Sequence, residues 1–85
     1  MKTFEYTVHD QRGIHARIAG YLTHTASAFP CRVVIQTEKK EADAKNMIML
    51  MNLGVKWGQT ITIRTDGEQE EEAMAAMKKF CEENL

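Results

Sequence analysis

The sequence has few residues of several kinds, and each shortage argues against a class of protein. It contains 1 proline and 5 glycines among 85 residues, with no internal repeat, low-complexity tract or linker. Its 2 cysteines, Cys31 and Cys81, form neither a metal-ligand spacing nor a disulfide framework, so we expect reduced, packed thiols. The formal net charge of −1 provides no global basic field that would attract nucleic acid.

Long apolar runs and glycine-rich loops are also missing. Met1-Lys2-Thr3 leads directly into a strand pattern, without a stretch that could act as a signal peptide or insert in a membrane. We therefore expect a cytoplasmic protein. Without a Gly-rich phosphate loop or a metal-ligand spacing, we expect no metal, nucleotide or other cofactor.

What remains is the composition of a soluble globular protein, with 44% hydrophobic and 27% charged residues. A chain of 85 residues allows one small domain over residues 1–85 and little volume for a deep enclosed pocket. This favours a surface site that works together with larger partners.

Four short segments have the signature of strands: residues 3–8, 32–37, 41–44 and 60–64. In the first, Phe4, Tyr6 and Val8 alternate with polar residues. The third is weak, with two alanines facing inward, and it follows a charged connection of hairpin length. We expect Trp57 to lie packed under the loop before the last strand.

Three segments have helical spacing. The first runs from Ala16 to the stop at Pro30, and the second, 47–53, is capped by Asn46 and stopped by Gly54. The third, 70–85, has an acidic first turn that suits the helix dipole and that we interpret as a solvated helix start. One stripe of it is apolar, formed by Ala73, Met74, Met77, Phe80 and Cys81.

The predicted order is β-α-β-β-α-β-α. It implies an α+β open-faced β-sandwich, in which three helices cover one face of a four-stranded, mainly antiparallel sheet.

The segment Gly13-Ile14-His15-Ala16-Arg17 lies where the first strand gives way to the first helix. If His15 is the N-cap, the backbone N–H groups of Ala16 and Arg17 are free to face a phosphate, which helix N-termini bind readily. Imidazole is a competent nucleophile near neutral pH. A cation such as Arg17 is unfavourable in a first helical turn, which suggests an anionic ligand. We therefore predict that His15 accepts and passes on a phosphoryl group.

This segment, the element order and the Met47-to-Gly54 segment followed by Thr60-Ile61-Thr62-Ile63 resemble the histidine-containing phosphocarrier (HPr) family of the bacterial phosphoenolpyruvate:sugar phosphotransferase system. The similarity covers essentially the whole chain. It implies an HPr-like domain that takes phosphate from Enzyme I and gives it to sugar-specific IIA proteins in transient complexes. It also implies a monomer, with no nucleic-acid partner and no direct membrane insertion.

The resemblance assigns roles to particular residues. It implies that phosphate is carried on Nδ1 of His15 and that Arg17 steers it. The implied docking face for donors and acceptors comprises Gly20, Met47, Ile48 and Met51. Two further candidates come from position alone: Arg12 is a second cation before His15 that strengthens phosphate binding or changes which partner docks, and His24, two turns beyond His15, is a candidate for the rim of the docking face. The helical spacing of 47–53 independently predicts Leu50 and Leu53 in the core, with Met47, Ile48 and Met51 partly exposed.

Three positions depart from the family pattern. Ile18 stands where most members have proline, which should leave the first turn less rigid and alter transfer rates. Asn46 matches the regulatory serine of gram-positive members; it caps a helix about as well but has no hydroxyl to phosphorylate. Arg12 stands where asparagine or serine is usual. These departures leave open an alternative, a regulatory binding module in which phosphorylation of His15 is only a switch, and a third reading, a nitrogen-related or other non-sugar branch.

Overall fold

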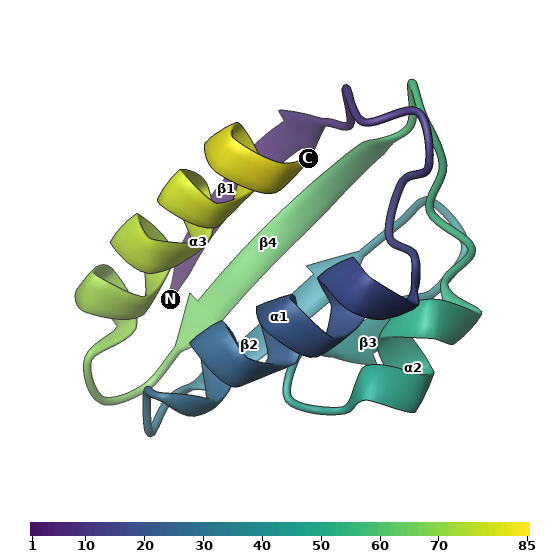
Figure 1. The fold of residues 1–85 in the computed structure, drawn as a ribbon. Helices are drawn as coiled ribbons and strands as arrows, with labels where there is room; N and C mark the ends of the chain where they lie inside the picture. The colour runs from purple at the N-terminus through teal and green to yellow at the C-terminus, as the bar shows by residue number, and fades with distance from the viewer.

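Four strands form one sheet in the order β1-β4-β2-β3, with every neighbouring pair antiparallel (Figure 1). The computed structural model describes residues 1–85. Its strands are β1 (Lys2–Thr7), β2 (Arg32–Gln36), β3 (Glu41–Asp43) and β4 (Thr60–Asp66). The longest, β4, lies between β1 and β2, so the first and last strands of the chain are neighbours.

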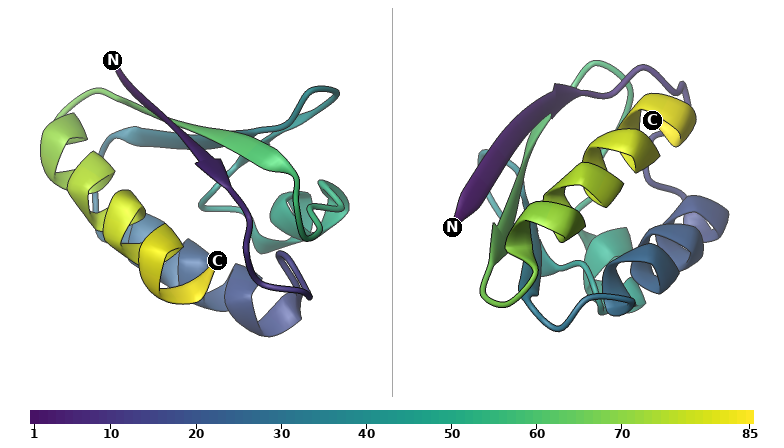
Figure 2. Two further views of the ribbon diagram at one scale, coloured as in Figure 1. Left: turned by 90° about the horizontal axis from the view of Figure 1, so that it is seen from above. Right: turned by 90° about the vertical axis from the view of Figure 1, so that its left-hand side faces the viewer.

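The three helices are α1 (Ala16–Ser27), α2 (Met47–Asn52) and α3 (Glu70–Asn84). They lie on one face of the sheet, whose other face is open (Figure 2). The predicted α+β open-faced sandwich and its element order are therefore confirmed, and the sheet is antiparallel throughout. None of the helices is long and apolar enough to span a bilayer.

The core lies between the sheet and the helices. Alternate residues of β4, namely Ile61, Ile63 and Thr65, are fully buried on the helical side, and the Thr65 hydroxyl donates to the Glu70 carbonyl at 2.9 Å. The whole predicted stripe of α3 is buried, as are Ala19, Leu22 and Ala26 of α1. Both cysteines are free and buried, and burial raises the pKa of Cys81 to about 12.

Most elements differ from the prediction by one residue at an end, and the larger differences are in α1 and β4. α1 ends at Ser27, and Phe29 packs against the core from beyond the helix, because a residue that precedes proline is disfavoured in the helical region. β4 extends two residues further than predicted because Arg32 and Val33 of β2 pair with Asp66 and Thr65.

Two other expectations were wrong. Trp57 is not packed under a loop; its side chain is 65% exposed. Glu70 is not merely part of a solvated helix start, because its carboxylate accepts from the amino group of Met1 at 2.7 Å and from the Gly67 N–H at 3.1 Å. These contacts lower the pKa of Glu70, the amino group contributing most. The contact with Met1 joins residues 69 positions apart in the sequence, so no local pattern indicates it.

Candidate functional site

Helix α1 begins at Ala16, and His15 is its N-cap, as the sequence predicted. His15 has extended backbone angles (φ −91°, ψ 176°), and its carbonyl accepts the first hydrogen bond of the helix from the Ala19 N–H at 2.8 Å. The N–H groups of Ala16, Arg17 and Ile18 have no hydrogen-bond partner within the helix, because the helix has no carbonyl group four residues before them. The helix thus presents three free donors and the positive end of its dipole beside His15.

The loop before His15 is fixed by backbone contacts to the segment that follows α2. Gly13 has a φ of +63°, and a Cβ there would lie 2.1 Å from the Val55 carbonyl oxygen, so only glycine fits. The Ile14 N–H donates to the same carbonyl at 3.1 Å, and the Gly13 N–H donates to the Asp10 carbonyl at 3.0 Å. Backbone hydrogen bonds therefore hold the loop that leads into His15 in one conformation.

The imidazole of His15 is half-buried, and its two nitrogens differ. Nε2 is buried without a hydrogen-bond partner, and the ring makes no capping hydrogen bond. Nδ1 makes no hydrogen bond and is not one of the buried, unpartnered atoms, so it keeps contact with solvent. The two ring nitrogens therefore have different surroundings.

Two guanidinium groups belong to this part of the chain. Arg12 and Arg17 are exposed, and neither takes part in an ion pair of the molecule. No aspartate or glutamate occurs in residues 11–37 or 44–65, which include all of α1 and α2. Both cations are therefore available to an anion held at the start of α1.

The predicted docking residues come together on α1 and α2, which lie side by side (Figure 1). The sulfur and methyl carbon of Met47 lie 3.8 Å from the place where a Cβ on Gly20 would stand, which is an ordinary van der Waals distance, so Met47 lies directly over Gly20. Ile48 is 72% exposed, Met47 and Met51 are also exposed, and Leu50 is fully buried. His24 is exposed on α1.

Sequence reasoning did not place Met49. It is as exposed as Met51, but its position two residues from both Met47 and Met51 puts it on the opposite flank of α2. Asn46 caps α2 as predicted, its Oδ1 accepting from the Met49 N–H at 3.1 Å.

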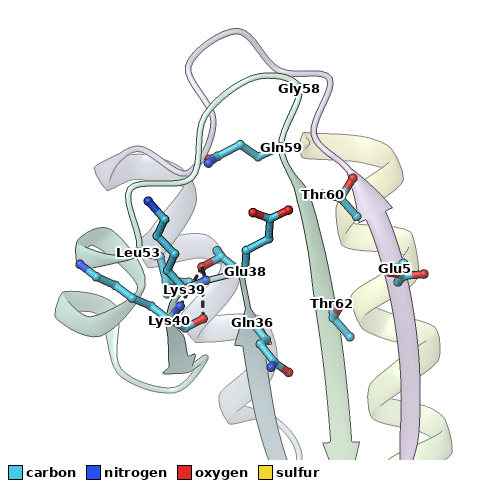
Figure 3. Close-up of a pocket in the computed structure, with 11 residues that line it drawn as sticks. Glu5, Gln36, Glu38, Lys39, Lys40, Leu53, Gly58, Gln59, Thr60 and Thr62 are labelled. Atoms are coloured by element: carbon cyan, nitrogen blue, oxygen red, sulfur yellow. Dashed lines mark hydrogen bonds between the residues drawn. The ribbon is translucent and has the colours of Figure 1, made fainter.

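A hollow of about 710 Å³ lies elsewhere, on the open face of the sheet beside the β2–β3 hairpin, where Glu38, Lys39 and Lys40 project (Figure 3). Leu53 is its single apolar lining residue, and none of the predicted site residues reaches it. An open polar hollow differs from the enclosed, mainly apolar pockets that bind small ligands.

Comparison with known proteins points to one family. Residues 2–83 match the family model described as "PTS HPr component phosphorylation site". The phosphocarrier protein HPr of Mycoplasma genitalium is 41% identical over 85 residues, covering 99% of this chain and 97% of that protein.

Solved structures agree. HPr-C-His from Thermoanaerobacter tengcongensis superposes with a TM-score of 0.91 at 32% identity, covering 96% of this chain and 92% of that one. The catabolite repression protein Crh of Bacillus subtilis, described as a swapped dimer, has a TM-score of 0.78 at 29% identity, covering 94% and 92%.

Proposed function

The chain belongs to the HPr family of phosphocarrier proteins of the phosphotransferase system, and from this premise we propose that His15 accepts a phosphoryl group from Enzyme I and passes it to IIA proteins. One observation carries the proposal: the accessible Nδ1 of an N-cap histidine beside three free backbone donors. In this role the protein is a cytoplasmic monomer that meets each partner transiently.

Acceptance begins with attack of the Nδ1 lone pair on phosphorus. The new N–P bond forms as the bond from phosphorus to the donor breaks, and the ring proton resides on Nε2. The N–H groups of Ala16 and Arg17 then face the phosphoryl oxygens, with the guanidinium of Arg17, and of Arg12 from the preceding loop, balancing their charge. No other group of the chain needs to change its bonding.

Release requires that the phosphoryl group is not held too tightly. An anion at a helix N-terminus gains only about 0.3–1 kcal/mol. Nε2 is buried without a partner whether it carries the ring proton or a lone pair, so no hydrogen bond of the protein to this nitrogen holds the phosphorylated ring in place.

We propose that both kinds of partner dock on the surface formed by Gly20, His24, Met47, Ile48 and Met51. Exposed methionine side chains adapt to differently shaped partners, which suits a carrier that must bind a donor and several acceptors. A shared surface also requires that the partners bind one at a time.

A phosphotransfer assay tests the proposal. The protein is incubated with Enzyme I, magnesium and phosphoenolpyruvate, and should acquire an acid-labile, base-stable phosphate that is absent in His15→Ala. Addition of a IIA protein should then remove the label. No label on the unaltered chain would overturn the proposal.

One observation favours a second function. The similarity to Crh, and Ile18 in the first turn of α1, fit a regulatory module that docks on a regulator or enzyme and uses phosphorylation only as a switch. In that case label forms on His15 but does not move to any IIA protein, whereas transfer to IIA supports the carrier.

A further inference from the structure

The six methionines fall into two groups that differ in exposure. Met74 and Met77 are buried in the core. Met47, Met49 and Met51 occupy three of the six positions of α2 and are 38%, 42% and 42% exposed. Met1, at the opposite end of the sequence, is the only other exposed methionine. Half of the methionines thus lie on the short helix that we propose for docking.

The accessible sulfur of the molecule is therefore thioether rather than thiol. Cys31 and Cys81 are 3% and 1% exposed. Burial also raises the pKa of Cys81, so its reactive thiolate is scarce at neutral pH. A thioether reacts without losing a proton, so its exposure decides its rate of oxidation.

We propose that α2 is a methionine-oxidation site, at which hydrogen peroxide converts Met47, Met49 and Met51 to sulfoxides and thereby closes the docking surface. At each sulfur the O–O bond of the peroxide breaks and one oxygen bonds to sulfur, which loses two electrons. The other oxygen leaves as water with both protons. The closing of the surface rests on the proposed function, whereas the selectivity of oxidation does not.

The position of Met47 explains why one added oxygen matters. Its sulfur packs over Gly20 where α1 and α2 meet. A sulfoxide there is polar, and a partner that covers the surface must remove its hydration without offering it a hydrogen bond in return. The same holds for Met51, which lies one turn from Met47 on the same side of α2, so oxidation weakens docking while His15 and the N-terminus of α1 stay unchanged.

Peptide mass mapping tests the selectivity. The folded protein is treated with hydrogen peroxide, and oxygen uptake is followed at each methionine and cysteine. We expect sulfoxide on Met47, Met49 and Met51 well before Met74 and Met77, and equal rates for all of them in urea. Oxidation of Met74, Met77 or either cysteine as fast as the methionines of α2 would overturn the proposal.

The transfer assay tests the consequence. At sub-saturating concentration, the oxidised protein should accept phosphate from Enzyme I on the order of tenfold more slowly, the loss that one central interface contact produces. A thiol-dependent methionine sulfoxide reductase, which removes the oxygen as water, should restore the rate. The variant M47L/M49L/M51L keeps apolar side chains of similar volume, and its transfer rate should be the same before and after peroxide treatment even though Met1 is still oxidised.

Two results separate the possible failures. If the protein with three sulfoxides remains folded by circular dichroism and transfers at the untreated rate, α2 oxidation does not close the surface and this proposal is wrong. If the untreated protein accepts no phosphate at all, the proposed carrier function is wrong, and the mass map alone then decides whether α2 is an oxidation site.

Discussion

Arg17 should favour phosphoryl transfer but disfavour the stability of the fold. It is exposed, unpaired and in the first turn of α1, where the helix dipole disfavours a cation. Arg17→Ala should lower phosphoryl transfer on the order of tenfold to a hundredfold, by loss of a charged contact to the phosphoryl group. The same change should leave stability equal or raise it by about 0.3–1 kcal/mol. Transfer kinetics and urea unfolding measure the two effects, with Arg17→Lys as the variant that keeps the charge; a loss of both transfer and stability would contradict the assigned role.

Gly13 offers a second test on a single residue, because it differs from Gly54 only in its surroundings. Both have positive φ, 63° and 66°, but a Cβ meets the Val55 carbonyl at Gly13 and nothing within 4 Å at Gly54. Gly13→Ala should therefore destabilise by about 3 kcal/mol or more, against about 1–2 kcal/mol for Gly54→Ala. Chemical denaturation measures both; equal losses would show that the loop before His15 yields to a side chain.

The role of a single residue could be predicted when the contacts that determine it come from residues nearby in the sequence. The role of His15 as N-cap follows from neighbours within a few positions, and so does the cap at Asn46. Glu70 was misjudged because its main partner, Met1, lies 69 residues away in the sequence. Trp57 was misjudged because no other segment covers it. The unequal burial of the two His15 nitrogens likewise has no signal in the sequence.

At the scale of one helix, Asn46 allows capping and regulation to be separated. Its side chain accepts the Met49 N–H, so Asn46→Ala should cost about 1 kcal/mol and Asn46→Ser nearly nothing. We expect HPr kinase to leave the start of α2 unphosphorylated in the unaltered chain, because asparagine has no hydroxyl group. Only Asn46→Ser provides a hydroxyl group that the kinase could phosphorylate. Urea unfolding and mass spectrometry provide the readouts; kinase-dependent phosphate at the start of α2 in the unaltered chain would refute the expectation.

The first turn of α1 can be made more rigid by a single change. Ile18 has a free N–H and is half-buried against the core, so Ile18→Pro loses no hydrogen bond but loses apolar contact. A fixed φ stabilises by about 0.4–1 kcal/mol, so net stability should change by less than about 1 kcal/mol. Amide exchange of Ala19, bonded to the His15 carbonyl, should slow, and transfer rates should change. Ile18→Ala is the matched control without a fixed φ; the same exchange rate in both variants would exclude rigidity as the cause.

For the molecule as a whole, the order of elements could be read from the sequence but the order of strands could not. The alternation of apolar and polar residues over 60–64 indicates a strand, and the apolar stripe over 70–85 indicates a helix. Each pattern is local because each element buries one face. The insertion of β4 between β1 and β2 depends on which strands meet after collapse, and no local pattern encodes it. The pairing of β1 with β4 brings the beginning of β1 beside the turn into α3. There the Glu70 carboxylate accepts a hydrogen bond from the amino group of Met1.

This contact makes the stability of the whole fold depend on pH. The Met1 amino group, and then the Gly67 N–H, lower the pKa of Glu70 in the folded state. A lowered folded-state pKa gives stability that is present above the ordinary value of 4.5 and lost as pH falls through the folded-state value. Glu70→Gln should therefore have a lower thermal midpoint than the unaltered chain at pH 7, with the difference shrinking on acidification below 4.5. Glu38→Gln removes an exposed carboxylate of the β2–β3 hairpin that has no ion pair and lies in no helix, and it should leave the profile unchanged. Matching profiles for the two variants would therefore show that the contact contributes nothing to stability.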